Sequence, residues 1–159
     1  MPVTHRQTLP IGIQSFEKLR KGHYYYVDKT PLIHTMAETG GYYFLSRPRR
    51  FGKSLLLDTL RCLFEGHEAL FEGLYIHDKW DWQQQHPVVR LSFGSGVMQN
   101  RAELDMRIRE QLRTERARLG VMLDHDTDIA GEFEHLIRQA CAQTGQRVVV
   151  LIDEYDKPI

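Results

Sequence analysis

The amino-acid sequence predicts an α/β fold, in which a mainly parallel sheet carries helices on both faces as a three-layer sandwich. Two observations support this prediction. Short runs rich in β-forming residues alternate along the chain with segments whose apolar residues recur at helical spacing. The strand pattern at 147–152 is apolar from Val148 onward, which is typical of a strand that is covered on both faces of a parallel sheet.

The segment 1–40 is expected to form a lead-in with one short strand and one helix. Residues 9–21 carry scattered apolar side chains, and the aromatic run 24–27 favours a strand. A helix should begin at Thr30, because Thr30 can cap it and Pro31 suits the first helical position. The glycines at 40–41 should end this helix.

The segment 41–159 is expected to hold the core of the fold. Strand patterns bounded by Gly, Pro or Ser alternate there with helical patterns. The predicted strands are 42–45, 88–93 and 147–152, and the predicted helices are 54–65, 101–119 and 129–143. Lead-in and core together are expected to form a single domain over 1–159.

The composition is that of an ordinary soluble globular chain, with 42% hydrophobic and 26% charged residues. It excludes intrinsic disorder. Lys plus Arg equal Asp plus Glu at 21 each, and this balance disfavours a nucleic-acid binder that acts through a basic field over the whole domain. The first residues lack the apolar core of a signal peptide, and no apolar run approaches a membrane span. We therefore expect a cytoplasmic protein without a membrane partner.

The segment 46–54 reads Ser-Arg-Pro-Arg-Arg-Phe-Gly-Lys-Ser and lies between a predicted strand and a predicted helix, as a P-loop requires. Gly52 lets the backbone approach a phosphate closely. Lys53 can reach the β- and γ-phosphates, and the Ser54 hydroxyl can join the shell of a Mg²⁺ ion. The start of the helix also favours an anion. The alternative is a Gly-Lys-Ser that only starts a helix, and the flanking strand and helix favour the phosphate loop over it.

One position departs from the general P-loop pattern, because Arg47 stands where the first glycine is usual. A side chain there disfavours a left-handed backbone. The arginines of the loop can supplement the phosphate charge, pair with acidic side chains, or form a solvated turn. The candidate residues for binding the nucleotide are Arg47, Pro48, Arg49, Arg50, Phe51, Gly52, Lys53 and Ser54.

Two carboxylates, Asp153 and Glu154, follow the last apolar strand pattern. Asp153 can hold Mg²⁺ together with Ser54, and Glu154 can act as the general base that polarises the attacking water. A polar turn without chemistry is the alternative for this pair alone. Because a phosphate loop precedes the pair with a strand and helices between, the two motifs together favour an ATPase site with catalytic Glu154.

These residues resemble the AAA-ATPase-like family, whose members often carry a PD-(D/E)XK nuclease-like domain behind the ATPase-like one. The resemblance covers the chain from about Leu9 to its end, and Arg47 is ordinary in that family. It implies ATP and Mg²⁺ as cofactors. The signature Asp28-Lys29-Thr30 also matches the family, and either a helix cap or a nucleotide contact can explain it. The blocks that carry the resemblance are 26–30, 44–54 and 151–159.

Members of the family are much longer, so the resemblance implies that this chain is an amino-terminal fragment. Carboxyl-terminal strands of the sheet, an arginine finger and the nuclease-like part, as a domain or as a partner chain, would lie elsewhere. The strand near Val148 would then lack a neighbour at one edge. Hydrolysis is expected only in the complete protein. A non-hydrolysing nucleotide-binding or interaction module, or the ATPase part of a nucleic-acid-processing protein, are the alternatives, and nucleic acid enters only through the family analogy.

A few other residues have ordinary structural explanations. Cys62 and Cys141 are expected to be small buried hydrophobes. Trp80 and Trp82 are expected to anchor a loop against the sheet. The mixed charges of the helix at 101–118 indicate a solvated face and not a nucleic-acid groove.

Overall fold

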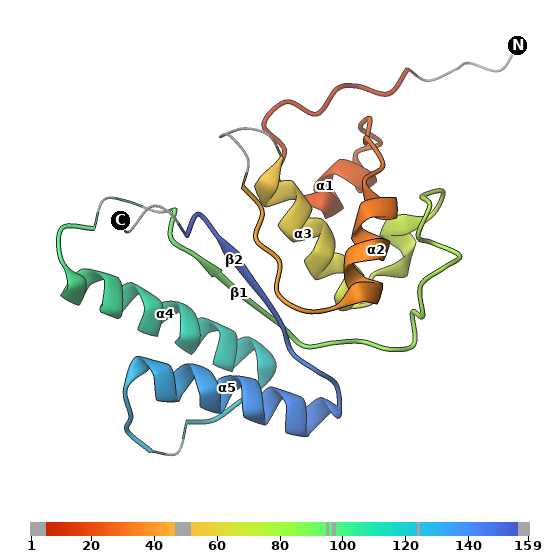
Figure 1. Ribbon diagram of the computed structural model, residues 1–159. Coiled ribbons are helices and arrows are strands. Elements are labelled where there is room, and N and C mark those ends of the chain that lie inside the picture. The colour runs from red at the N-terminus through yellow and green to blue at the C-terminus, as the bar shows by residue number, and fades with distance from the viewer. Residues whose placement is uncertain (1–5, 47–51, 95, 97, 124, 156–159) are drawn as a thin grey trace, which may run out of the picture. The chain divides into compact units, whose positions relative to one another are not determined.

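The computed structural model describes residues 6–46, 52–94, 96, 98–123 and 125–155. The chain divides into two compact units, 1–84 and 85–159 (Figure 1). The first unit is helical, and the second combines a small parallel sheet with two long helices. The fold is therefore α/β, as the sequence predicts. The grouping of both units into one domain stays a prediction.

The first unit consists of short helices around a small aromatic and aliphatic core. Phe16 is fully buried and packs against Phe71, with the two ring centroids 4.8 Å apart. Its helix begins at a capping Ser15, whose side chain accepts a hydrogen bond from the backbone N–H of Lys18. Leu19, Ile33, Leu63 and Ile76 complete the buried set. The helices of this unit are α1 (Phe16–Lys21), α2 (Thr30–Thr39), α3 (Lys53–Phe64) and the 3₁₀-helix η1 (Glu68–Phe71).

The strands predicted at 24–27 and 42–45 are wrong, because neither segment forms a strand in the structure. In the first segment, backbone N–H groups bond to the end of α1 and to the lead-in, and Tyr26 packs edge-on against Phe16. In the second, Phe44 is 74% exposed. Aromatic residues favour strands only where a neighbouring strand and a covering layer are present, so their preference alone does not make a strand.

The two tryptophans do anchor a loop, but they pack on helical residues of the first unit and not on the sheet. Trp80 meets Phe64 of α3, and Trp82 meets Phe71 of η1, with ring centroids 5.4 Å and 5.2 Å apart. The Trp82 indole N–H also donates a hydrogen bond to the carbonyl of His77. The expected partner was wrong because the loop after η1 returns to the helices that precede it.

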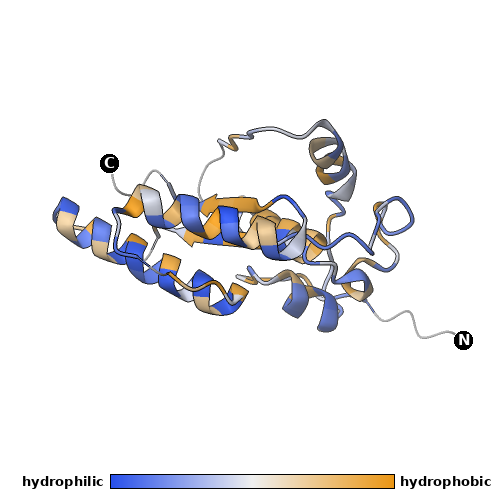
Figure 2. Cartoon of the chain, turned by 90° about the horizontal axis from the view of Figure 1, so that it is seen from below, coloured by the Kyte–Doolittle hydropathy of each residue, from blue (hydrophilic) through white to orange (hydrophobic). Residues whose placement is uncertain are grey.

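The second unit is built on two parallel strands, β1 (Val88–Ser92) and β2 (Val149–Asp153), which lie side by side (Figure 1). Their register pairs Val88 with Val149 and Ser92 with Asp153. Both strands match the predicted runs to within two residues at each end. In Figure 2 the strands are mainly hydrophobic, whereas the helices alternate between hydrophilic and hydrophobic residues.

Two long helices, α4 (Arg101–Leu119) and α5 (Ile129–Thr144), pack against the sheet within the second unit. Side chains of Asn100 and Asp128 cap their starts, and left-handed glycines follow their ends. These local signals explain why the sequence predicts both helices so closely. The buried cluster between helices and strands consists of Val89, Leu91, Leu112, Val121, Leu136 and Ala140.

A charged cluster links α4 to α5 inside this unit. The side chain of Glu132 is only 6% exposed and accepts hydrogen bonds from Arg109 and Arg116. Part of α4 is therefore not the solvated surface that its composition indicates. Its charges satisfy a buried carboxylate on the neighbouring helix.

Polar side chains of α4 also close the outer edge of β1. Gln111 accepts a hydrogen bond from the backbone N–H of Ser92 at 2.6 Å and donates one to its carbonyl at 2.9 Å. One turn further, Glu115 accepts from the N–H of Arg90 at 3.2 Å. Arg118 donates to the carbonyl of Val88. The groups that would pair with another strand at this edge are thus bonded to a helix.

Among the described residues, no helix has the length and apolar character that crossing a membrane requires. Cys62 is buried, as expected. Burial raises the pKa of the Cys62 thiol to about 12, the neighbouring Arg61 notwithstanding. Cys141 is exposed, and the expectation that it is buried is wrong, because it lies on the outward side of α5.

Candidate functional site

The predicted phosphate loop leads into α3 at Gly52. Gly52 has a left-handed backbone with φ of 78°, which a residue without Cβ adopts at little cost. Its carbonyl accepts the first helical hydrogen bond, from Leu56 at 2.9 Å. Lys53 and Ser54 are then the first two residues of the helix, and both are half-buried. The prediction that a helix begins at Gly-Lys-Ser is confirmed.

The remaining residues of the loop lie outside the described residues. These are Arg47, Pro48, Arg49, Arg50 and Phe51, and their assignment to the nucleotide stays a prediction.

The signature Asp28-Lys29-Thr30 is held firmly within the first unit. One carboxylate oxygen of Asp28 accepts hydrogen bonds from the N–H and the hydroxyl of Thr30, at 2.9 Å and 2.6 Å. The other oxygen accepts from the N–H of Tyr75 at 2.8 Å. Thr30 is fully buried, and its hydroxyl accepts a hydrogen bond from the N–H of Ile76 at 3.2 Å. Asp28 and Thr30 therefore tie the start of α2 to the segment at 75–76.

The expectation that Thr30 caps α2 is wrong. Lys29 stands at the N-cap position, Thr30 is the first helical residue, and the cap-like hydrogen bonds come from Asp28. Pro31 lies in the first helical turn, and Gly40 follows its end, as expected. An Asp side chain that accepts a hydrogen bond from the backbone N–H two residues further on is a common turn motif. This explains why Asp28, and not Thr30, supplies the acceptor at the start of α2.

The middle residue of the signature, Lys29, lies near Gly52. The Nζ atom of Lys29 lies 3.8 Å from the position that a Cβ on Gly52 would occupy. Asp28 and Thr30 thus have structural roles, while Lys29 directs a positive charge to the start of α3. From the sequence alone these three residues could not be separated, because the approach of Lys29 to Gly52 depends on tertiary structure.

The hydrogen bonds to Asp28 make the folded state sensitive to acid. Partial burial alone would raise the pKa of the Asp28 carboxyl, but the hydrogen bonds from Thr30 and Tyr75 outweigh burial and lower it from 3.8. A carboxyl whose pKa is lower in the folded state contributes stability above its unfolded pKa, and that contribution is lost as the pH falls through the folded value.

We expect Asp28→Asn to destabilise the first unit at pH 6 and to weaken its dependence on pH below about 4. An Asn amide nitrogen cannot accept the hydrogen bond from Tyr75, and the side chain does not titrate. Unfolding followed by tryptophan fluorescence measures this, because both tryptophans lie in the first unit. An acid dependence equal to that of the wild type would contradict the role of Asp28.

The acidic pair stands at the end of β2 in the second unit. Asp153 is the last residue of the strand and is 8% exposed. One of its carboxylate oxygens accepts a hydrogen bond from the N–H of Glu154 at 2.9 Å. Glu154 has a left-handed backbone with φ of 52°, which is uncommon for a residue with a Cβ. The strand end therefore turns sharply between the two carboxylates.

Gly94, which sequence reasoning missed, lies against Glu154. A Cβ built on Gly94 would overlap the Glu154 carboxylate, so a larger residue at this position would require the carboxylate to shift. The register of the sheet explains the contact. Ser92 of β1 pairs with Asp153 of β2, so the residues that follow the two parallel strands leave the sheet at the same end. A glycine directly after a predicted strand was the available signal.

The predicted site residues are distributed over both units. Gly52, Lys53 and Ser54 belong to the first, and Asp153 and Glu154 to the second. Among the described residues, no group of three or more His, Cys, Asp or Glu side chains could hold a metal ion. The Ser54 hydroxyl and the Asp153 carboxylate are hard oxygen donors, which suit Mg²⁺ when nucleotide phosphates and water supply its other ligands.

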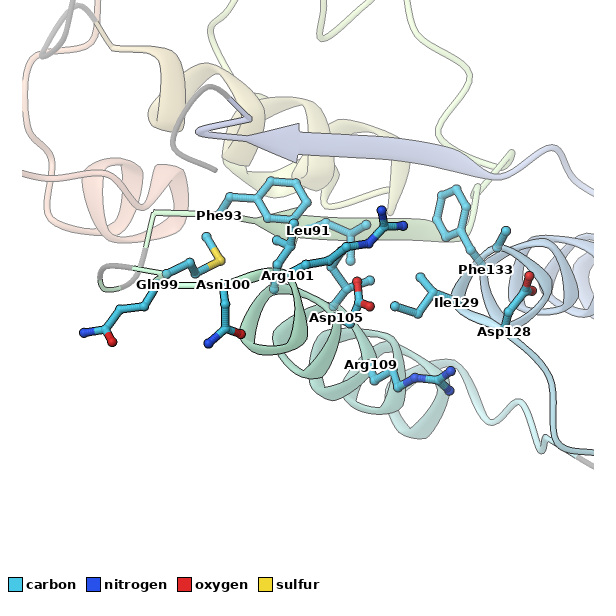
Figure 3. A pocket seen from close by; sticks show the side chains of 14 residues that line it. Leu91, Phe93, Gln99, Asn100, Arg101, Asp105, Arg109, Asp128, Ile129 and Phe133 are labelled. Carbon is cyan, nitrogen blue, oxygen red and sulfur yellow. The ribbon is translucent and has the colours of Figure 1, made fainter. Parts of the chain in front are cut away.

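An open pocket of about 900 Å³ lies in the second unit, where α4 and α5 begin (Figure 3). Leu91, Ile129 and Phe133 contribute apolar side chains, whereas Arg101 and Asp105 contribute charges. It contains none of the residues that the sequence assigns to the nucleotide site.

Comparison with known proteins agrees with this set of motifs. The model of the AAA-ATPase-like family, described as predicted AAA-ATPase, matches residues 10–159. A protein of Azotobacter chroococcum mcd 1, named "Uncharacterized protein in vnfD 5'region", is 56% identical over 155 residues. These residues are 97% of this chain, and the chain spans only 30% of the length of that relative. No solved structure matches significantly. The chain therefore belongs to the AAA-ATPase-like family.

Proposed function

We propose that this chain binds ATP with Mg²⁺ and is the nucleotide-binding part of an ATPase that hydrolyses ATP in the complete protein. The observation that carries the proposal is the left-handed Gly52 at the start of α3, followed directly by Lys53 and Ser54. In a P-loop this arrangement presents backbone N–H groups, an ammonium and a hydroxyl to the phosphates. Membership of the AAA-ATPase-like family supports the same conclusion.

Each residue of the loop has a role in this proposal. Gly52 lets the backbone approach the phosphates, and Lys53 neutralises the charge of the β- and γ-phosphates. The arginines at positions 47, 49 and 50 add positive charge to the same loop. Pro48 and Phe51 belong to the same loop sequence, and in this proposal they contribute backbone groups to it.

Asp153 and Glu154 have different roles in this proposal. Asp153 would hold Mg²⁺ together with Ser54, and the bound ion supplies charge neutralisation on the phosphate oxygens. Glu154 would accept a proton from the attacking water as a general base. Its carboxylate lies against Gly94, where the absence of a side chain leaves room for it beside the end of β1.

We further propose that the sheet of the second unit belongs to a three-layer P-loop sandwich. The backbone N–H of Val149 and the carbonyl of Asp153 form hydrogen bonds with the segment of β1. Because successive residues of a strand direct their backbone N–H and C=O groups to opposite edges, those of Val150 and Ile152 face the edge away from β1. Side chains of α4 close the outer edge of β1. A further parallel strand can therefore add only beside β2, next to the acidic pair.

Binding of ATP to the phosphate loop should raise the thermal midpoint of the chain, as any ligand selective for the native state does. With MgATP at about 100 times its Kd, the expected stabilisation is about 2.7 kcal/mol. Lys53→Ala should remove most of this shift. Differential scanning fluorimetry with and without nucleotide measures it.

Lys18→Ala is the matched control, because Lys18 lies on α1 with its side chain outside the loop, and its shift should equal that of the wild type. An equal shift in the wild type and in Lys53→Ala contradicts the phosphate loop. A Lys53-dependent shift without phosphate release, also in the longer protein, favours a non-hydrolysing module. A nuclease-like carboxyl-terminal partner and an action on nucleic acid are proposals that rest on the family alone.

A further inference from the structure

We propose that Lys29 is a second lysine of the phosphate site and binds the polyphosphate chain of the nucleotide together with Lys53. This inference rests on the proposed function and adds to it a residue that lies outside the loop motif. It also assigns a role to each residue of the Asp28-Lys29-Thr30 signature. Asp28 and Thr30 fix the backbone, and Lys29 binds the ligand.

The backbone of Lys29 is fixed from both sides. Asp28 bonds to Thr30 and Tyr75, and Thr30 bonds to Ile76, so the peptide units that flank Lys29 cannot rotate without breaking these hydrogen bonds. The Lys29 side chain itself is half-buried and starts from this fixed point. Fixing the origin of a long side chain lowers the entropy it loses when it binds a ligand.

The ammonium of Lys29 lies beside Gly52, at the start of α3. Its Nζ atom is 3.8 Å from the Cβ position of Gly52, and Gly52 is the residue directly before α3. In the described part of the chain, neither Lys29 nor Lys53 has an acidic partner or a hydrogen-bond acceptor for its side chain. Other lysines differ, since Lys21 pairs with Glu17 and Lys79 with Asp78.

The local electrostatics favour an anion at this point. The amino-terminal end of a helix carries a partial positive charge, so the Lys29 ammonium near the start of α3 is repelled by that end. The rest of the loop adds only arginines and no acidic residue. A bound polyphosphate would offset this repulsion, because its negative charge attracts both the ammonium and the helix end.

Affinity measurements on the full 159-residue chain test this assignment. Fluorescent ATP, ADP and AMP analogues with Mg²⁺ are titrated into the wild type, Lys29→Gln, Lys29→Arg and the control Lys18→Gln. We expect Lys29→Gln to weaken ATP binding about tenfold, as for the loss of a charge-assisted hydrogen bond. ADP should be affected less and AMP hardly at all. Lys29→Arg should retain most of the affinity, and Lys18→Gln all of it.

A structural role for Lys29 would give a different pattern. It would lower the thermal midpoint without nucleotide, or weaken AMP and ATP equally, and either result overturns the inference. Competition with inorganic phosphate separates a nucleotide site from a simple anion site. If phosphate displaces ATP at concentrations similar to that of ATP, the inference about Lys29 is also overturned. Lys29→Arg with wild-type affinity and Lys29→Gln with a tenfold loss at an unchanged midpoint support it.

The test also separates this inference from the proposed function. If the wild type binds no ATP, or if Lys53→Ala binds as well as the wild type, the proposed function fails. If Lys53→Ala loses ATP while Lys29→Gln binds like the wild type, only the role of Lys29 fails.

Discussion

Glu132→Ala is expected to lower the free energy of unfolding of the second unit by about 3–5 kcal/mol, the usual cost of breaking a buried ion pair from one side. Its carboxylate is almost fully buried and accepts hydrogen bonds from Arg109 and Arg116. Removing it leaves the guanidinium of Arg116, which is 12% exposed, without this acceptor, whereas Arg109 is 40% exposed and keeps its bond to the carbonyl of Thr127. Amide hydrogen exchange in α4 and α5 measures the loss directly within this unit.

Glu134→Ala is the matched control on the same helix. Glu134 pairs with Arg138 one turn away, and the two side chains are 67% and 74% exposed. An exposed pair of this kind contributes about 0.3–0.5 kcal/mol, so the control should change little. A similar loss in both variants would show that the buried cluster contributes no more than a surface pair.

In the complete protein, where hydrolysis is expected, Glu154→Gln should lower the rate of phosphate release from ATP by about 10²–10⁴-fold while leaving nucleotide affinity nearly unchanged. Glutamine keeps the size and hydrogen bonding of the side chain, but it cannot accept the proton of the attacking water. Single-turnover phosphate release and nucleotide titration, measured side by side, separate chemistry from binding. Equal rates for the wild type and the variant would contradict the role of Glu154 as a base.

The wild-type chain should itself be slow. We expect phosphate release that depends on Lys53 to stay below about one per second, the low end of ordinary enzyme turnover. An arginine finger is worth about a thousandfold or more, and the motifs of this sequence assign no residue to that role. Arginines 47, 49 and 50 are the residues that could replace it in part. A faster, Lys53-dependent rate would contradict this expectation.

Local signals explain which elements the sequence predicts well. The helix at 101–119 begins after Asn100, which caps it, and ends at Gly120, so both boundaries lie in the sequence itself. The helix start at Gly52 and the apolar strands at 88–92 and 149–153 are equally local.

The failures share a physical cause, because they depend on contacts between distant residues. Tyr42 and Phe44 have the composition of a strand, but whether they form one depends on a neighbouring strand. The burial of Glu132 depends on arginines of another helix, and the approach of Lys29 to Gly52 on the fold of the first unit. None of these pairings leaves a periodic pattern in the sequence.

The hydrogen bonds between β1 and the side chains of Gln111, Glu115 and Arg118 also limit how strands of other copies can add to this sheet. A fibre grows by adding strands indefinitely, and each added copy must offer one edge to receive the next. Here side chains of α4 already cap the outer edge of β1. If two copies paired through their β2 strands, the remaining outer edges would both be capped β1 edges, and a third copy could not add to them. Edge pairing between copies would thus stop at a dimer. The capped edge of β1 thus limits the growth of this sheet by strand addition to the side of β2.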